Sequence, residues 1–134
     1  MAHSKLPEPT ERELQILKVL WDRGEASVHD VYLALRDELG IVQNTVQAFL
    51  RLMEDKGLVA HRTAGRSFVY RPLLRRERTS KDLLSGLLDG VFDGALDQLV
   101  ASALALKKPS ADELAKLREL LAAAEAANKQ RRKP

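Results

Sequence analysis

The amino-terminal part of the chain carries two successive signals for amphipathic helices. Thr10 is followed three residues later by Glu13, which is the spacing of a capping box, and the apolar run behind it stops at Gly24. Ser27 opens a second stretch in the same way, with apolar residues at helical spacing until Gly40. This pattern predicts two short helices, one on each side of residues 24–27.

A third apolar stripe follows after a tight connection. Val46, Phe49, Leu50 and Met53 recur at helical spacing, and Gly57 stands where a helix C-terminus is expected. Because residues four apart share a helix face, the side chains between these positions point away from the core. The stripe therefore predicts a third helix with one apolar and one polar face.

The hydrophobic period changes after Gly57. Residues 58–63 and 67–71 have the composition of two short strands, joined by a turn at 64–66 and ended by Pro72. Three helices and a hairpin, in this order, are typical of a winged helix-turn-helix, whose third helix enters the DNA major groove. The fold class that we expect is mainly α with a small β-hairpin wing.

Helical periodicity resumes beyond an arginine-rich stretch and continues toward the C-terminus. Gly86, Gly90 and Gly94 interrupt it, and each glycine inside a helix costs about 1 kcal/mol relative to alanine. We therefore expect kinks or a break near residues 89–94. A last helix begins at Pro109-Ser110 and gives way to a basic segment with the composition of a disordered tail.

The predicted organisation has three parts. Residues 1–74 form a winged helix-turn-helix DNA-binding domain, 75–128 a helical dimerisation region, and 129–134 a basic disordered tail. Amphipathic helices attached to a small domain cannot cover their own apolar stripes, and two-fold pairing is the commonest form of oligomer. We therefore expect a homodimer, with an interface that contains Leu84, Leu88, Phe92, Leu96, Leu99, Val100, Leu104, Leu117 and Leu121.

The net charge of +3 is the sum of opposed segments. Residues 1–42 and 79–128 each hold 5 basic and 8 acidic residues, whereas 43–78 hold 8 basic and 3 acidic residues. A basic middle segment between acidic arms is expected where one face meets a polyanion such as nucleic acid. A solvated basic loop is the alternative explanation of the same charges.

The polar face of the third helix has the chemistry of base recognition. Asparagine and glutamine bond adenine, arginine bonds guanine, and an alanine methyl group can meet thymine. Thr45 lies near the helix start, where its hydroxyl and nearby N–H groups could hold a phosphate. The residues expected to point outward are Gln43, Asn44, Gln47, Ala48 and Arg51. An uncharged, solvated face with Asn44 as the helix N-cap is the alternative.

The hairpin supplies a second set of candidate contacts with DNA. Arg62 and Arg66 bracket its tip, with Ser67 beside them. A wing that lies along the DNA backbone needs cations and hydroxyl groups at this place. Ordinary arginines on an edge strand would produce the same sequence.

The sequence fits three classes of function to different degrees. A repressor that binds double-stranded DNA fits the polar helix face and the wing, whereas a protein-interaction module would use the same face without sequence preference. An enzyme fits worst, because the sequence groups no nucleophile, base and orienting residue. The chain has no cysteine, its three histidines are scattered, and no apolar run reaches the roughly 20 residues of a membrane helix. We expect no metal, no cofactor, no insertion into a membrane and a cytoplasmic location.

Several short motifs together carry a family resemblance. They are Glu13-Leu14-Gln15-Ile16-Leu17 with Leu20-Trp21, Asn44-Thr45-Val46-Gln47, Lys56-Gly57-Leu58-Val59, residues 65–72, and Phe92-Asp93-Gly94-Ala95 ahead of Leu99-Val100. In these motifs the chain resembles the penicillinase repressor family, the winged-helix regulators of the BlaI/MecI/CopY type. The resemblance covers nearly the whole sequence.

The resemblance implies a homodimer whose winged helices bind an inverted-repeat operator and whose C-terminal helices dimerise. It also implies a membrane metalloprotease sensor as a further partner, which relieves repression by proteolysis. By position, the recognition helix of that family would carry Gln43, Asn44, Thr45, Gln47, Ala48 and Arg51, and its wing Arg62 to Ser67.

This chain departs from the family pattern in three places. Val42-Gln43-Asn44 stands where antibiotic-responsive members have Ser-Pro-Lys, so their operator sequence does not carry over. Those members are inactivated by cleavage of an Asn-Phe bond, and this sequence contains no such pair. Copper-responsive members end in paired cysteines, which are absent here, so the composition excludes copper sensing by thiolates.

Overall fold

The computed structural model describes residues 8–132, which form two compact units. One unit runs to Ser85 and the other begins at Gly86. The division falls inside a helix, beyond the domain boundary expected after residue 74. The chain is mainly helical with a small antiparallel sheet, as predicted. No helix within residues 8–132 is long and apolar enough to span a membrane.

The first three helices follow the local signals of the sequence closely. Thr10 and Ser27 both form the capping boxes predicted for them, with Glu13 and Asp30 as the third helical residues. Gly40 ends the second helix in the left-handed conformation that glycine adopts without strain. The helices are α1 (Glu11–Arg23), α2 (Val28–Leu39) and α3 (Gln43–Asp55).

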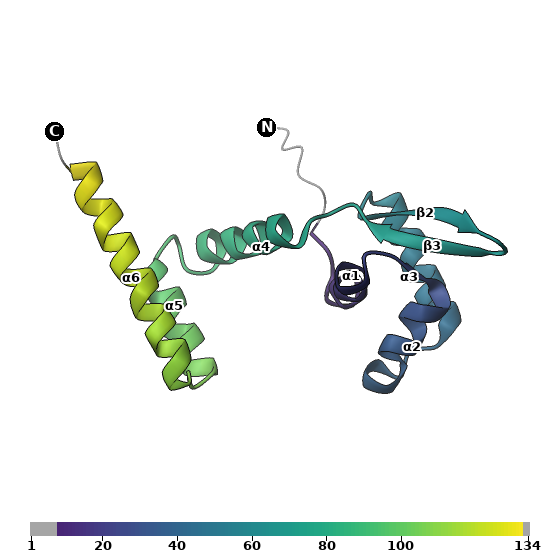
Figure 1. Cartoon of the computed structure of the whole chain (residues 1–134), viewed down its shortest axis with the longest axis horizontal. Helices are drawn as coiled ribbons and strands as arrows, with labels where there is room; N and C mark the ends of the chain where they lie inside the picture. The colour runs from purple at the N-terminus through teal and green to yellow at the C-terminus, as the bar shows by residue number, and fades with distance from the viewer. Residues whose placement is uncertain (1–7, 133–134) are drawn as a thin grey trace. The chain divides into compact units, whose positions relative to one another are not determined.

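The predicted hairpin is present, and it belongs to a sheet of three strands rather than two. Strands β2 (Val59–Ala64) and β3 (Ser67–Pro72) pair antiparallel through the turn at Gly65, as Figure 1 shows. A third strand, β1 (Ala26–Ser27), pairs with β3 on its other edge. The sequence analysis missed β1 because two residues are too few to show the alternation that marks a strand.

The core of the first unit joins all three helices to the sheet. The apolar face predicted for α3 is buried at Val46, Leu50 and Met53, and Phe49 packs against the same core. Burial on this scale supplies the main driving force for folding. The other core residues are Ile16, Leu17, Leu20, Ala26, Val31, Leu35, Leu58, Val59 and Tyr70.

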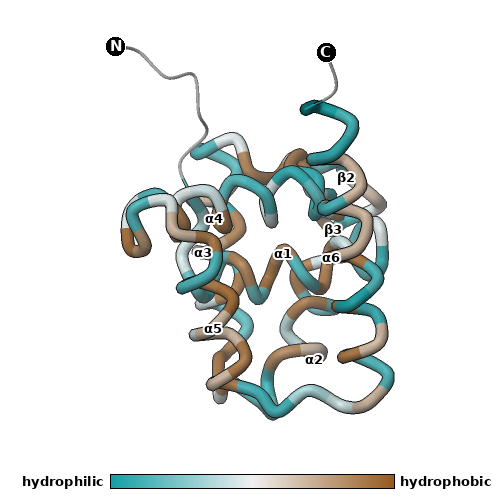
Figure 2. The backbone as a smooth tube through the Cα atoms, turned by 90° about the vertical axis from the view of Figure 1, so that its left-hand side faces the viewer, coloured by the Kyte–Doolittle hydropathy of each residue, from teal (hydrophilic) through white to brown (hydrophobic). Residues whose placement is uncertain are grey.

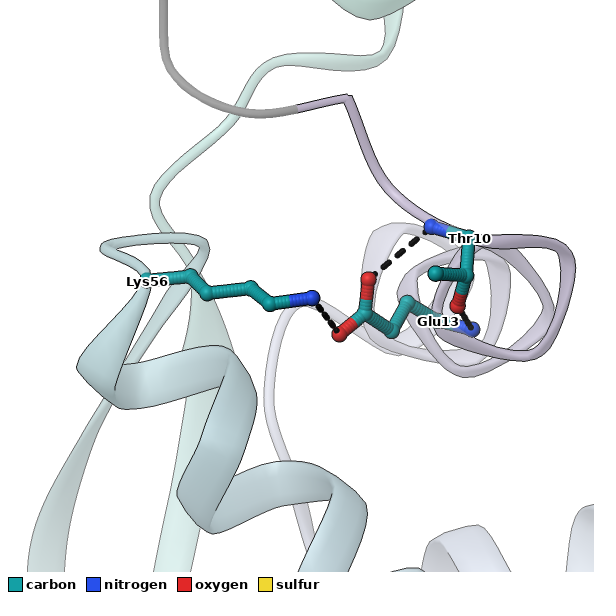
Figure 3. Close-up of polar contacts among 3 residues, drawn as sticks. All are labelled: Thr10, Glu13 and Lys56. Carbon is teal, nitrogen blue, oxygen red and sulfur yellow. Dashed lines mark hydrogen bonds and ion pairs between the residues drawn. The ribbon is translucent and has the colours of Figure 1, made fainter.

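A buried polar network ties the start of α1 to the end of α3 (Figure 3). The carboxylate of Glu13 accepts a hydrogen bond from the Thr10 N–H at 2.9 Å and one from Lys56 Nζ at 2.8 Å. The side chain of Glu13 is only 3% exposed. Burial raises the pKa of Glu13, but the bonds from Lys56 and Thr10 outweigh it and hold the pKa below its ordinary value.

The start of α4 (Arg76–Gly90) is fastened to α1 within the first unit. Trp21 donates a hydrogen bond from its indole Nε1 to the Leu74 carbonyl at 2.9 Å. The guanidinium of Arg76 lies 5.5 Å from the centre of the Trp21 ring and bonds Asp22 at 3.0 Å. The arginine-rich stretch therefore contacts the winged helix directly, which explains why the compact unit extends beyond residue 74.

The second unit contains the end of α4 and two further helices, α5 (Leu96–Leu106) and α6 (Ala111–Arg132). The predicted break is present at residues 91–95, where Asp93 and Gly94 have positive φ angles of 52° and 81°. Gly86, in contrast, lies inside α4 without interrupting it. Ser110 and Glu113 form reciprocal capping bonds at the start of α6, where the last helix was expected.

The prediction of a disordered tail was wrong for residues 129–132. These residues continue α6 to Arg132, while 133 and 134 lie outside the described part of the chain. Two physical effects extend the helix to Arg132. Lys129, Arg131 and Arg132 stand in the last turn, where cations interact favourably with the helix dipole, and Lys and Arg are good helix formers.

We predict that Lys56→Met lowers the free energy of unfolding by about 1–3 kcal/mol, because the buried Glu13 carboxylate loses its cationic partner. Urea denaturation at pH 7 measures this difference. Lys18→Met is the matched control, since Lys18 is an exposed lysine on α1. Equal stabilities of Lys56→Met and the wild type would contradict the role given to the pair.

The deficit of Lys56→Met should also depend on pH. Because the folded pKa of Glu13 is lowered, its contribution is complete above the pKa of the unfolded carboxyl and disappears as the pH falls through the folded pKa. Repeating the denaturation in acid should therefore bring variant and wild type closer together.

Candidate DNA-binding surface

The outward face of α3 presents the residues that the sequence analysis assigned to DNA. Gln43, Asn44, Thr45, Ala48 and Arg51 are exposed, and Gln47 is half-buried. Because α3 buries its apolar stripe in the core, its orientation fixes these six side chains on the solvent side. They offer amide, hydroxyl, methyl and guanidinium groups, and none carries a negative charge.

The N-terminus of α3 differs from those of α1 and α2. Its N-cap is Val42, whose side chain makes no capping bond, whereas α1 and α2 both begin with a capping box. Asn44 lies inside the helix, so the alternative in which it serves as the N-cap is wrong. The first-turn N–H groups of α3 therefore have no side-chain acceptor on the helix cap, and such groups attract anions.

A groove of about 270 Å³ joins the start of α3 to the hairpin. Gln43 and Gln47 line it from α3, and Arg66 and Ser67 line it from the turn and β3. The structure thus brings together two parts of the predicted site that lie about twenty residues apart in sequence. The remaining lining residues are Ser27, Val28, His29 and Phe68.

His29 is a residue of this surface that the sequence analysis missed. Its Nδ1 lies 3.0 Å from the side-chain oxygen of Gln43, so the first turn of α2 contacts the first turn of α3. The sequence did contain a signal, since His29 comes two residues after the N-cap Ser27, on the turn of α2 that precedes its buried stripe. The sequence alone does not show which element this turn faces, because that depends on the tertiary fold.

Arg62 is placed differently from Arg66. It stands on β2 opposite Val69, three residues before the turn glycine, and is not among the residues that line the groove. Its guanidinium donates two hydrogen bonds to Glu25, at 2.7 and 3.1 Å. This bond from Arg62 lowers the pKa of Glu25, with the charges of Arg62 and Arg71 acting in the same direction.

The opposite face of the hairpin is fixed to α3 by His61. Its ring lies 4.3 Å from that of Phe68, and its Nδ1 lies 2.7 Å from the Glu54 carboxylate. The hairpin therefore keeps a defined position relative to α3, since His61 of β2 contacts both Phe68 of β3 and Glu54 of α3. Among residues 8–132, no group of three or more His, Asp or Glu side chains is placed to hold a metal ion.

Comparison with known proteins gives one family and several similar structures. The family model described as penicillinase repressor matches residues 9–123. The penicillinase repressor of Bacillus licheniformis is 26% identical over 117 residues, which are 87% of this chain and 91% of that protein. The solution structure of the DNA binding domain of the repressor BlaI is 28% identical, with a TM-score of 0.49, and covers 55% of this chain and 90% of its own.

A second solution structure, of monomeric Bacillus licheniformis BlaI in complex with the blaP half-operator, is 29% identical with a TM-score of 0.48. It covers 55% of this chain and 89% of its own. The family match itself extends from residue 9, two residues before α1, into α6, and so includes α3, the hairpin and α5. The chain therefore belongs to the penicillinase repressor family and is a DNA-binding transcriptional repressor, not an enzyme.

Proposed function

We propose that this repressor acts as a homodimer, in the cytoplasm, on an inverted-repeat operator, and that it represses by occluding a promoter. The observation that carries the proposal is the groove in which Gln43 and Gln47 of α3 meet Arg66 and Ser67 of the hairpin. It combines groups that bond base edges with a cation and a hydroxyl that bond phosphate. Winged helices use this division, because base contacts specify the sequence while phosphate contacts set the register.

The side chains of α3 divide into two roles under this proposal. Gln47, Ala48 and Arg51 lie on successive outward positions and read base edges in the major groove. Thr45, together with the uncapped N–H groups of the first turn, holds a phosphate. The helix has no acidic residue before Glu54, so nothing on this face repels the DNA backbone.

Helix α4 and the helices of the second unit supply the proposed dimer interface. Of the nine residues expected there, Leu84, Leu96, Val100, Leu104, Leu117 and Leu121 are exposed, and the other three are half-buried. Helices α5 and α6 contain no buried residue, and Figure 2 shows α5 as hydrophobic along most of its length. Exposed apolar side chains in this number mark an interaction site, and a second copy of the chain is the simplest partner.

Release of repression by a membrane metalloprotease is not part of the proposal. The family resemblance implies such a partner, but the sequence contains no Asn-Phe bond of the kind cleaved in antibiotic-responsive members.

The proposed function is tested by genomic selection of DNA fragments with the purified protein, followed by footprinting of the best fragment. A protected pseudo-palindrome with half-sites about one helical turn apart is the expected result. Titration at two salt concentrations should show the steep loss of affinity that phosphate contacts impose. If no fragment is enriched, the polar face of α3 serves contact with another protein instead.

We predict that Gln47→Ala and Arg51→Ala weaken operator binding about 5- to 150-fold each, because a good base contact is worth about 1–3 kcal/mol. Binding to random DNA should change much less. Electrophoretic mobility shifts with both DNAs measure the two effects, with Lys18→Ala on α1 as the control for loss of a positive charge. Equal losses on operator and random DNA would exclude base reading by these residues.

A second prediction concerns Arg62, which Glu25 holds in the free protein. We expect Glu25→Gln to strengthen DNA binding and to steepen its salt dependence by about one phosphate contact, because Arg62 is then released. Glu38→Gln is the control, because it removes the same charge far from the groove. Glu38 lies near the C-terminal end of α2, whereas His29, which lines the groove, lies near its start. If Glu25→Gln binds like the wild type, Arg62 is a structural residue of the wing and not a DNA contact.

A third prediction tests the dimer. Leu104→Asp should shift the protein to monomer, because a charge would be buried in the apolar interface. Leu106→Asp is the matched control on the same helix, since Leu106 is 88% exposed and lies outside the expected interface. Sedimentation equilibrium measures both masses. A dimeric Leu104→Asp, or a monomeric wild type, would refute the assignment.

A further inference from the structure

Leu52 is an apolar side chain on the outward side of α3. Among the residues of α3 (Gln43–Asp55), it is the large apolar side chain that remains exposed, at 56%, while Val46, Leu50 and Met53 are buried. An exposed leucine contributes little to the core of the free protein, because its apolar surface stays in water. A role for Leu52 in recognition rests on the proposed function, since α3 must first meet DNA.

One flank of α3 faces the hairpin. Gln43 and Gln47 line the groove together with Arg66, and the carboxylate of Glu54 lies 2.7 Å from His61 of β2. The three residues of α3 are spaced four and seven positions apart, which places them along one side of the helix. This flank therefore carries two amides and a carboxylate that already has a partner.

The opposite flank of α3 is an apolar strip. Ala48 precedes Leu52 by four residues and Thr45 precedes it by seven, so the three side chains follow one another along the helix. All three are exposed. They present the methyl groups of threonine and alanine and the branched end of leucine, and α3 carries no acidic residue before Glu54. The strip thus lies within the part of the helix that a polyanion can approach.

The chemistry of the strip matches one feature of the DNA major groove. Thymine presents a methyl group there, whereas the other bases present only hydrogen-bond donors and acceptors in the pattern that a helix reads. A leucine side chain cannot hydrogen-bond a polar base edge, and covering such an edge leaves it without a partner. Leu52 consequently favours thymine in two ways, by contact with its methyl group and by the cost of covering another base.

We propose that Leu52 is a specificity-determining residue of this repressor, which contacts the 5-methyl group of a thymine in each half of the operator. Ala48, one turn earlier on the helix, extends the same apolar surface. Gln47 and Arg51 read the polar edges of neighbouring bases. Recognition by α3 is then divided between hydrogen bonds on one flank and apolar contact on the other.

The experiment compares operators that differ only in thymine methyl groups. Deoxyuridine offers the same hydrogen-bonding groups as thymidine but lacks the methyl group, so each thymine of the footprinted operator is replaced in turn, in both half-sites. At one position wild-type affinity should fall about fourfold for each half-site, because a buried methyl group contributes about 0.8 kcal/mol. Electrophoretic mobility shifts with the full chain measure these affinities.

The loss on removal of the methyl group should depend on Leu52. Leu52→Ala should bind the thymine operator more weakly and should no longer distinguish thymine from deoxyuridine at that position. Leu52→Met keeps an apolar side chain of similar volume, so it should retain most of the preference for thymine.

Leu73→Ala is the matched control. Leu73 is 46% exposed and follows the last residue of β3, at the end of the hairpin away from the turn at Gly65. This variant should keep the wild-type preference for thymine. Circular dichroism confirms that each variant is folded, which is expected because Leu52 and Leu73 are both exposed.

The outcomes separate this inference from the proposed function. If no deoxyuridine lowers wild-type affinity, or if Leu52→Ala keeps the wild-type preference for thymine at every position, the role of Leu52 is overturned. Equal losses of Leu52→Ala on operator and random DNA overturn it as well. Sequence-specific binding by the wild type remains in each of these cases. If no operator is enriched at all, the proposed function fails, and the role of Leu52 fails with it.

Discussion

The position of α3 relative to α1 depends on one ion pair whose carboxylate is buried. Glu13 closes the capping box of α1 and at the same time accepts the Lys56 ammonium from the residue that ends α3. A carboxylate this deeply buried is stable only while its hydrogen bonds are complete, so the two helix ends cannot separate without exposing an unpaired charge. The apolar core packs α1 and α3 into one unit, and the Glu13–Lys56 pair joins the start of α1 to the end of α3.

The three helices of the first unit begin in two different ways. The first turns of α1 and α2 are paired locally by capping boxes. Toward the groove, α3 begins without a side-chain cap, and of the six outward side chains assigned to DNA only Arg51 is charged. Unused hydrogen-bonding capacity is thus concentrated on the surface proposed to meet DNA, where a ligand can satisfy it.

The sequence predicted what depends on local signals and missed what depends on tertiary contacts. Capping pairs, glycine stops and the apolar stripe of α3 act within a few residues, so the helices, the hairpin and the outward face of α3 could be foreseen. The contact of His29 with Gln43 and the capture of Arg62 by Glu25 join residues 14 and 37 positions apart. Strand β1 exists only because β3 offers it an edge, and Lys129, Arg131 and Arg132 extend a helix already begun.

The missing cap of α3 links binding to local stability. A helix end whose N–H groups lack a side-chain acceptor frays more readily than a capped one, so the first turn of α3 is less secured than the capped first turns of α1 and α2. A phosphate at this turn would supply the acceptor and hold the backbone of Gln43 and Asn44 in helical form. DNA would then complete the fold of the surface that recognises it. Part of the free energy of the contacts with DNA would be spent on ordering that turn, and the measured affinity would be lower by that amount.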